Sequence, residues 1–244
     1  MKLTKEQFKQ KTAKMAGNTG IQLNDNQLEK LYLYKEMLIE WNEKINLTAI
    51  TDDEEIIAKH IVDSIEIVKY IKQGQSIIDV GTGAGLPGII IAIYFEGKVN
   101  ITLFDALNKR ILFLQQVIEK LGLTNVEAVH GRAEETSKDR KYREAYDIAV
   151  SRAVARLNVL LELTVPFVKV GGNCIYMKAD KTKEELDESK RAIKELELSL
   201  TCVNEYRVQM DEQELNHTII ILSKLKETKD KYPRQFVKIK KSPL

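Results

Sequence analysis

The sequence contains little cysteine and no long apolar run. Cys174 and Cys202 are the only two cysteines among 244 residues, and neither has a second cysteine or a histidine at ligand spacing. A disulfide framework and a zinc site are therefore not expected. No apolar run approaches the roughly 18–20 residues that cross a bilayer, and neither an apolar stretch nor a small-residue cleavage site follows the charged N-terminus. We expect an unprocessed, cytoplasmic protein with no membrane span and no bound metal.

The charges are distributed unevenly along the chain. Residues 224–244 include eight basic and two acidic residues, a net charge of +6, whereas the whole chain carries +2 and the rest of it therefore −4. A basic stretch on a mildly acidic body favours contact with a polyanion. A solvated tail would have the same composition, so charge alone does not decide between the two interpretations.

The first 70 residues have the pattern of helices. Leu28, Leu31, Leu38 and Trp41 recur near helical spacing, without the alternation of a strand. Asn24 followed by Gln27 has the spacing of a capping box, which marks a helix start. We interpret residues 1–70 as a helical extension that packs on the remainder of the protein.

From residue 76 onward, short strands alternate with helices. The predicted strands are rich in Ile and Val and cover residues 76–80, 100–104, 126–129, 147–150 and 173–177. The predicted helices lie near residues 88–94, 109–121, 155–168 and 183–196. This alternation predicts an α/β fold with a doubly wound, mostly parallel sheet.

Two further strands, residues 201–209 and 217–222, follow the last helix. An acidic connection that contains Asp211, Glu212 and Glu214 joins them, and no helix intervenes. Strands joined without a crossover helix should pair antiparallel. The sheet is therefore expected to end in an antiparallel hairpin.

A glycine-rich loop follows the first strand and opens a helix. Its sequence is Asp79-Val80-Gly81-Thr82-Gly83-Ala84-Gly85-Leu86-Pro87-Gly88. A dinucleotide fingerprint Gly-x-Gly-x-x-Gly beginning at Gly81 would need glycine at position 86, where the residue is Leu86. The pattern Asp-x-Gly-x-Gly-x-Gly instead resembles the first motif of class I methyltransferases, in which the loop holds the methionine part of S-adenosylmethionine. A parallel sheet that ends in an antiparallel hairpin is typical of the same fold. We therefore predict cofactor contacts at Gly81, Gly83 and Gly85, with a purely structural turn as the alternative.

Two more segments at the ends of strands suit a nucleoside. Asp105 ends the second strand, where its carboxylate can accept hydrogen bonds from both ribose hydroxyls, although it could instead only cap the following helix. Residues 131–134 follow the third strand, from which a backbone or side-chain group can meet the adenine; a solvated loop would read much the same.

The residues after the fourth strand, Ser151-Arg152-Ala153-Val154, are where such enzymes place acceptor chemistry. The sequence has neither the Asn/Asp-Pro-Pro-aromatic motif that binds an exocyclic amine nor a Pro-Cys nucleophile. A ring nitrogen such as guanine N7 carries no proton to remove, so its methylation needs alignment more than a general base. Arg152 could hold the cofactor or the acceptor, or pair with a neighbouring acid, and we assign no catalytic acid or base.

The three histidines, His60, His130 and His217, are scattered along the chain and favour structural roles. His60 and Asp63 are one helical turn apart and could form a local hydrogen bond.

Several segments together resemble the glucose-inhibited division protein B family, from about residue 41 to the C-terminus. They are residues 41–50 (Trp-Asn-Glu-Lys-Ile-Asn-Leu-Thr-Ala-Ile), 60–64, 79–88, Asp105 with Lys109 and Arg110, 131–135, 151–155, 169–172, and the tail with Tyr232-Pro233-Arg234 and Pro243-Leu244. The Trp-Asn and Tyr-Pro-Arg segments are specific, whereas the glycine loop is common to many methyltransferases. Leu86 and Ala106 depart from the phenylalanine and serine usual in the family.

The resemblance implies an S-adenosylmethionine-dependent methyltransferase that modifies guanine N7 in 16S ribosomal RNA, free or within the small ribosomal subunit. It implies cofactor contacts at Gly81, Leu86, Ala133, Glu134 and Arg152. It also gives phosphate contacts to the tail, at Lys231, Arg234, Lys238 and Lys240.

The resulting division is a helical extension (1–70), a methyltransferase core (71–225) and a basic tail (226–244). A monomer is favoured. The alternatives are a methyltransferase that acts on a small molecule or a protein, and a ribosome-assembly factor without catalysis.

Overall fold

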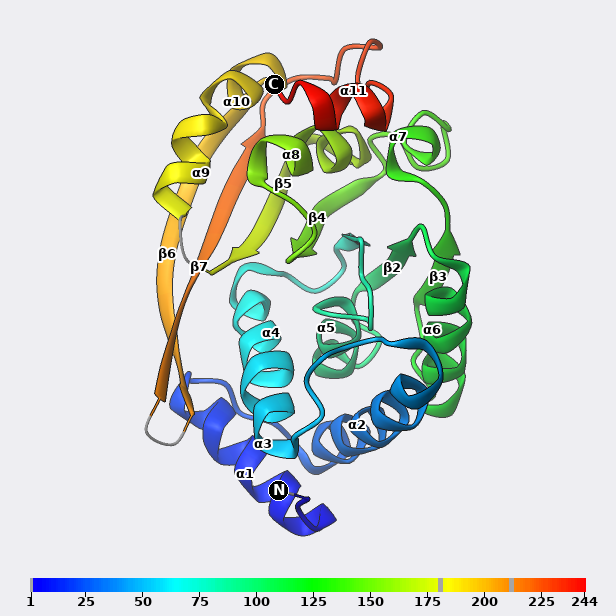
Figure 1. The fold of residues 1–244 in the computed structure, drawn as a ribbon, viewed down its shortest axis with the longest axis vertical. Coiled ribbons are helices and arrows are strands. Elements are labelled where there is room, and N and C mark those ends of the chain that lie inside the picture. The colour runs from blue at the N-terminus through cyan, green and yellow to red at the C-terminus, as the bar shows by residue number, and fades with distance from the viewer. Residues whose placement is uncertain (1, 180–181, 211–212) are drawn as a thin grey trace.

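The computed structural model describes residues 2–179, 182–210 and 213–244, and a seven-stranded sheet forms its framework (Figure 1). The strand order is β3-β2-β1-β4-β5-β7-β6. The strands are β1 (Ser76–Val80), β2 (Asn100–Asp105), β3 (Val126–His130), β4 (Tyr146–Arg152), β5 (Val168–Lys178), β6 (Leu198–Met210) and β7 (Gln213–Lys224). The first five pair in parallel, and β7 pairs antiparallel with both β5 and β6. The parallel sheet and its terminal hairpin are confirmed.

Helices cover both faces of this sheet. The chain begins with α1 (Lys5–Asn18), α2 (Asp25–Ile45), α3 (Asp53–Glu55), the π-helix η1 (Ile56–Val62), α4 (Asp63–Ile65) and the 3₁₀ turn η2 (Glu66–Tyr70). The later helices are α5 (Gly88–Phe95), α6 (Asn108–Lys120), α7 (Ala133–Thr136), α8 (Leu157–Thr164), η3 (Val165–Phe167), α9 (Thr182–Glu188), α10 (Lys190–Glu195) and α11 (Phe236–Lys241). In the part of the chain that is described, none of these helices is long and apolar enough to cross a membrane.

The core consists of two hydrophobic clusters, one on each face of the sheet. Neighbouring residues of β1 enter different clusters, Ile77 on one side and Ile78 on the other, because side chains alternate along a strand. The Ile77 cluster includes the N-terminal helices, α5 and α6, whereas the Ile78 cluster includes α8, α10 and the tail residues Tyr232 and Leu244. Residues 2–70 are thus one wall of the core.

Several boundaries differ from the sequence prediction, and the strands β4, β6 and β7 are each longer than expected. The helix expected at 155–168 is shorter, because Pro166 cannot continue an α-helix and a 3₁₀ turn leads into β5, which begins at Val168 rather than Asn173. The helix expected at 183–196 is divided into α9 and α10 at Ser189. Of the acidic connection, Glu214 belongs to β7, whereas Asp211 and Glu212 lie outside the described residues.

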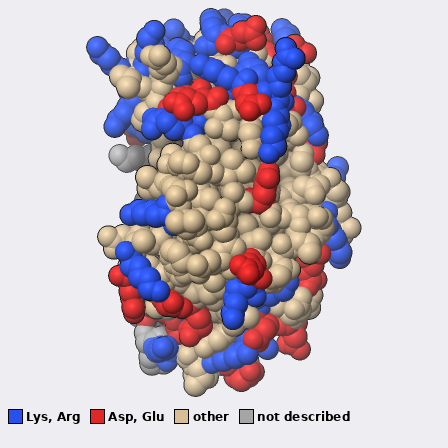
Figure 2. All heavy atoms as spheres, turned by 90° about the vertical axis from the view of Figure 1, so that its right-hand side faces the viewer, with Lys and Arg blue, Asp and Glu red and all other residues tan. Residues whose placement is uncertain are grey.

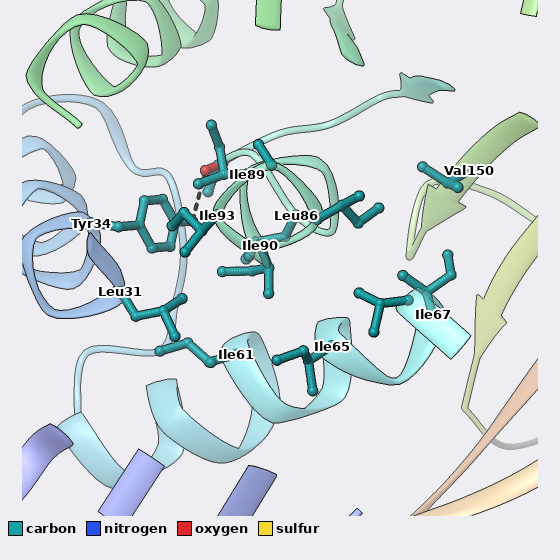
Figure 3. Close-up of a cluster of buried hydrophobic side chains, with 14 of the residues drawn as sticks. Leu31, Tyr34, Ile61, Ile65, Ile67, Leu86, Ile89, Ile90, Ile93 and Val150 are labelled. Carbon is teal, nitrogen blue, oxygen red and sulfur yellow. Dashed lines mark hydrogen bonds between the residues drawn. The ribbon is translucent and has the colours of Figure 1, made fainter. Parts of the chain in front are cut away.

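The helix α2 connects the N-terminal extension to the glycine loop. It begins with the expected capping box, in which Asn24 and Gln27 bond each other's backbone N–H groups. Its apolar face buries Leu31 and Leu38, and Figure 3 shows Leu31 and Tyr34 facing the isoleucines of α5. The Tyr34 hydroxyl donates a hydrogen bond to the Ala84 carbonyl, at 2.8 Å. The extension therefore supports the loop directly.

The C-terminal tail is packed against the body of the protein. Tyr232, Ile239 and Leu244 are buried, and the Arg143 guanidinium donates to the carbonyls of Thr228 and Tyr232. The tail is consequently not a solvated chain, although its lysine side chains are exposed to solvent.

Asp79 fixes the turn from β1 into α5. It is fully buried, and one carboxylate oxygen accepts from the Thr82 hydroxyl at 2.6 Å and from the Gly88 N–H at 2.8 Å. Its other oxygen has no partner. Burial raises the pKa of Asp79 to about 6, against the opposing effect of these two hydrogen bonds.

This pKa predicts a pH-dependent effect of Asp79→Asn. Between about pH 4 and pH 6 the folded protein keeps a proton that the unfolded chain has lost, so the free energy of unfolding falls as pH rises. The asparagine has no such proton to lose and retains an oxygen for Thr82 and Gly88. Relative to the wild type, the variant should therefore gain roughly 2–3 kcal/mol of stability between pH 4 and pH 7.5. Urea denaturation at both pH values measures this gain.

Asp25→Asn is the control, because the Asp25 side chain is 98% exposed. It should change by much less over the same pH range. An equal change in both variants would contradict the assignment to Asp79.

Candidate cofactor and acceptor site

The glycine loop lies at the carboxyl ends of β1 and β2. Gly81, Gly83 and Gly85 all have positive φ angles, of 73°, 61° and 95°, which favour glycine because it lacks a Cβ. The N–H groups of Gly81 and Thr82 donate to the Phe104 carbonyl. The Gly83 N–H donates to the Asp105 carboxylate at 2.9 Å. The structure thus brings together the loop and the acid that the sequence places a little over twenty residues apart.

The space beside the loop differs between two of the glycines. A Cβ on Gly83 would have only the Gly81 carbonyl oxygen within 4 Å, so this side of the loop is open. A Cβ on Gly81 would lie 2.7 Å from Val154, in the segment after β4. The loop and the segment expected to carry acceptor chemistry are therefore in direct contact.

Asp105 is nearly buried and organises its surroundings. It accepts from the Leu107 N–H at 2.9 Å through one oxygen, and from Gly83 and the Arg110 guanidinium through the other. The N-cap position of α6 is Leu107, so Asp105 is not the cap residue. The oxygen that bonds Leu107 has acceptor capacity left for a ribose hydroxyl, and the ribose contact stays a prediction.

The remaining cofactor residues have different surroundings. Leu86 is buried in the Ile77 cluster, and Figure 3 shows its side chain among those of α5 and α4, so only its backbone is left for a ligand. Ala133 and Glu134 form the first turn of α7, directly after β3. The Glu134 carboxylate pairs with the Arg132 guanidinium at 2.8 Å. Their contacts with adenine stay predictions.

Arg152 lies in the wall of a cavity of about 690 Å³, which we call the Arg152 cavity. The cavity is lined by β4, β5 and the segment after β4, by η1 and α4, and by Tyr206, Leu215 and His217 of the hairpin. It meets the glycine loop at Val154, which lines the cavity and contacts Gly81.

A buried carboxylate, Asp63, joins the polar groups of this wall. One of its oxygens accepts from Arg152 at 2.7 Å, and the other from the Tyr206 hydroxyl and from His217 Nδ1, both at 2.6 Å. Burial by itself raises the pKa of Asp63, but the hydrogen bond from His217 and the charge of Arg152 leave it below its ordinary value. Arg152 does pair with an acid, although one 89 residues away rather than a sequence neighbour.

His60 does not bond Asp63, so the expected local pair is wrong. Its Nε2 is 2.9 Å from the Thr48 hydroxyl, and its buried Nδ1 has no partner. Burial, with the Arg152 charge adding to it, lowers the pKa of His60 to about 4. The ring is therefore neutral near pH 7.

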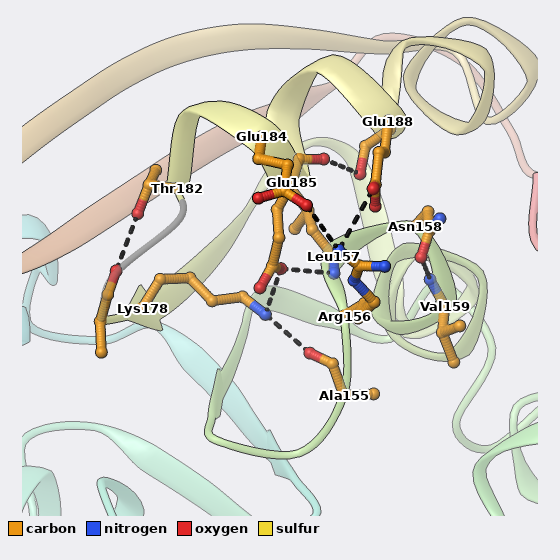
Figure 4. A network of polar contacts seen from close by, with 12 residues as sticks. Ala155, Arg156, Leu157, Asn158, Val159, Lys178, Thr182, Glu184, Glu185 and Glu188 are labelled. Atoms are coloured by element: carbon orange, nitrogen blue, oxygen red, sulfur yellow. Dashed lines mark hydrogen bonds and ion pairs between the residues drawn. The ribbon is translucent and has the colours of Figure 1, made fainter.

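Hydrogen bonds and ion pairs hold residues 155–157, which follow Val154, against Lys178 and α9 (Figure 4). The Lys178 ammonium bonds the Ala155 carbonyl at 2.7 Å and the Glu185 carboxylate at 2.8 Å, and Glu185 also accepts from the Leu157 N–H. Arg156 pairs with Glu184 and Glu188 of α9. Sequence reasoning found neither this network nor the one around Asp63, because no spacing signal relates residues that are so far apart.

The predicted phosphate-binding residues divide into two kinds. Lys231, Lys238 and Lys240 are exposed, and Figure 2 shows Lys and Arg side chains gathered at the end of the molecule where α7 and α11 lie. Arg234 instead forms a bidentate ion pair with the fully buried Glu162, with a closest distance of 2.6 Å. The Arg234 guanidinium thus serves to hold the tail on α8.

No group of three or more His, Cys, Asp or Glu side chains arranged to hold a metal ion occurs within residues 2–179, 182–210 and 213–244.

Solved structures resemble this fold at low sequence identity. P. horikoshii TYW2 in complex with MeSAdo aligns with a TM-score of 0.53 at 17% identity, over 67% of this chain and 61% of that one. A SAM-dependent methyltransferase from Aquifex aeolicus aligns with a TM-score of 0.53 at 17% identity, over 72% of this chain and 96% of that one. These likenesses establish the class I methyltransferase fold.

Sequence relatives are much closer. Proteins named ribosomal RNA small subunit methyltransferase G from Clostridium perfringens (strain 13 / Type A) and Acetivibrio thermocellus are 47% and 48% identical to this chain. The alignments cover 95% and 94% of this chain, and 96% and 93% of those proteins. The family model GidB, described as rRNA small subunit methyltransferase G, matches residues 27–216. The chain therefore belongs to the GidB family of rRNA small subunit methyltransferases.

Proposed function

We propose that this protein transfers the methyl group of S-adenosylmethionine to N7 of a guanine in 16S ribosomal RNA, in the cytoplasm. The observation that carries the proposal is the contact between Val154 and Gly81, which places the Arg152 cavity directly beside the glycine loop. A cavity of about 690 Å³ suits a nucleobase with part of its sugar, within the usual range of ligand sites. The names of the relatives support the substrate.

The residues around the glycine loop fit S-adenosylmethionine. The open side of Gly83 allows a ligand to approach the backbone, and Asp105 has acceptor capacity for the ribose. The first turn of α7, Ala133 and Glu134, would meet the adenine. The neighbours described as SAM-dependent or bound to MeSAdo support this choice.

The chemistry places few demands on acid–base groups. The sulfonium of S-adenosylmethionine supplies an activated methyl group, and guanine N7 offers a lone pair without a proton. The task of the protein is to align the two partners and to exclude water. Val154 and Ala155 supply an apolar wall between the loop and the cavity, and Lys178 and Glu185 fix this segment through the Ala155 carbonyl and the Leu157 N–H.

A direct assay tests the reaction. The protein is incubated with radiolabelled S-adenosylmethionine and with small-subunit RNA or subunits that lack the modification, and the RNA is then treated with borohydride and aniline, which cleave at N7-methylguanosine. We expect label in the RNA and one enzyme-dependent cut. Label without a cut would overturn the N7 assignment, and label only in a small molecule or a protein would overturn the RNA substrate.

The ribose contact is tested by a double-mutant cycle, because Asp105→Ala also removes the bond to Gly83. Wild type and Asp105→Ala are titrated calorimetrically with S-adenosylhomocysteine and with its 2′-deoxy analogue. Loss of the 2′-hydroxyl should weaken binding about tenfold in the wild type and little in the variant. Equal losses in both proteins would assign Asp105 to loop support alone.

The exposed tail lysines are tested without truncation, because Ile239 and Leu244 are buried. Replacing Lys231, Lys238 and Lys240 with Gln should weaken RNA binding and flatten its salt dependence by up to about 3 in log–log slope. Cofactor affinity should not change.

The matched control replaces Lys2, Lys14 and Lys44, exposed lysines of the N-terminal segment, and removes the same charge. If both triple variants bind RNA equally well, the tail has no specific part in binding.

A further inference from the structure

The helix α11 presents a face that combines apolar and basic side chains. Val237, Lys240 and Lys241 are one helical turn apart, and all three are exposed. Among the large apolar side chains that the structure describes, Val237 has the highest exposed fraction, 74%. Phe236 precedes it and is half-buried. We call these four residues the α11 face.

We propose that the α11 face and Arg132 bind unpaired nucleotides of the small-subunit RNA next to the guanine that is methylated. The bases stack on Phe236, Val237 and Arg132, and the lysines contact the phosphates. This inference rests on the proposed function, because it concerns the RNA that carries the acceptor guanine. It adds base stacking to the phosphate contacts proposed above, and it specifies single-stranded RNA at this surface.

The uncompensated positive charge of the C-terminal tail is concentrated on α11. Of the eight basic residues within 224–244, five form an ion pair with a glutamate, namely Lys224, Lys226, Lys229, Lys231 and Arg234. The other three, Lys238, Lys240 and Lys241, have no ion-pair partner among the described residues. Residues 235–244 also contain no acidic residue. Such a surface is complementary to a polyanion.

The apolar side chains of the face indicate which form of RNA fits. A duplex keeps the faces of its bases inside the stack, whereas unpaired nucleotides expose faces that stack on aromatic rings and on guanidinium planes. The Arg132 guanidinium lies over the Phe236 ring, with Cζ 5.7 Å from the ring centroid. The Arg132 side chain nevertheless stays 52% exposed. Together with Val237, this pair favours unpaired RNA over a duplex.

The α11 face adjoins the proposed cofactor site through Arg132. The Arg132 guanidinium pairs at 2.8 Å with Glu134, in the turn of α7 that is proposed to meet the adenine. Figure 1 shows α7 and α11 at the same end of the molecule, and the contact between Arg132 and Phe236 joins them. An acidic protein would match the charge, but the acceptor RNA is the partner that has to reach this edge of the sheet.

The test compares two strands that carry the same phosphates. One is an oligouridylate of about twelve nucleotides, and the other is a strand of equal length whose riboses carry no base. Fluorescence anisotropy measures the binding of each strand to the wild type, to Phe236→Leu and to Val237→Ser over a range of salt concentrations. Leucine keeps an apolar contact with Arg132 and removes the aromatic face. Val203→Ser is the matched control, because it makes the same change at another exposed valine, on β6.

We expect the wild type to bind the oligouridylate about tenfold more tightly than the strand without bases. Phe236→Leu should lower this ratio about fivefold and Val237→Ser about threefold, because each removes a surface on which a base stacks. The affinity for the strand without bases, and its dependence on salt, should not change, since all the lysines remain. Val203→Ser should behave as the wild type does.

Methylation of unmodified small-subunit RNA supplies a second measurement. Phe236→Leu and Val237→Ser should raise KM for the RNA about threefold and leave kcat within about twofold, because the α11 face holds nucleotides that do not react. Thermal unfolding and titration with S-adenosylhomocysteine accompany each variant. If Phe236→Leu does not fold, Val237→Ser decides the test, since that side chain is 74% exposed.

Equal losses of affinity for the two strands in both variants, or no loss for either strand, would overturn base stacking on the α11 face. A Val203→Ser protein that loses as much preference for bases as Val237→Ser would overturn it as well. A wild-type protein that prefers the oligouridylate through Phe236 and Val237 but labels no RNA would overturn the proposed function and leave the binding of unpaired RNA intact.

Discussion

One buried carboxylate joins the parts of this protein that meet at the Arg152 cavity. Asp63 begins α4, and its partners come from β4, β6 and β7. Removal of one member of a buried charged network leaves the other uncompensated, at a cost of about 3–5 kcal/mol. The backbone pairing from β4 through β5 to β7 and β6 positions the hairpin. Asp63 adds side-chain bonds that join the N-terminal extension to β4 and to the hairpin at the cavity.

The glycine loop depends on the same extension from another direction. Tyr34 of α2 bonds the Ala84 carbonyl, and Leu86 enters the cluster built by α5 and the N-terminal helices. On its other side, Asp79 and Asp105 accept N–H groups of the loop and of the start of α5. Residues 2–70 thus do more than cover a face of the sheet, because they support the backbone to which the cofactor is proposed to bind.

The charged residues of the C-terminal tail lie in two different environments. The Arg234–Glu162 pair and the burial of Tyr232 fix the tail on the Ile78 side of the sheet. The lysines around them stay exposed and form the basic end of the molecule (Figure 2). A packed segment holds its lysines in one orientation, so it would lose less conformational entropy on binding phosphates than a free tail would. The net charge of the sequence does not distinguish these two environments, because a basic residue in a structural ion pair and one on the surface each add one positive charge.

Elements with local sequence signals could be predicted before the fold was known. The apolar run before the glycine loop predicted both ends of β1 correctly. The absence of a crossover helix predicted the antiparallel hairpin. The spacing of Asn24 and Gln27 predicted the start of α2. The glycine loop and Asp105 could be expected to lie close together, because parallel strands end at a common edge, and the bond from the Gly83 N–H to Asp105 confirms that they do. Local signals failed where a proline or a serine interrupts a helical pattern, at Pro166 and Ser189. Three sets of contacts become visible only in the folded protein. Asp63 binds Arg152, Tyr206 and His217. Val154 lies against Gly81, and Glu162 holds Arg234. These contacts join residues about 70 to 150 positions apart, and their energy comes from burial and charge pairing that exist only once the chain has folded.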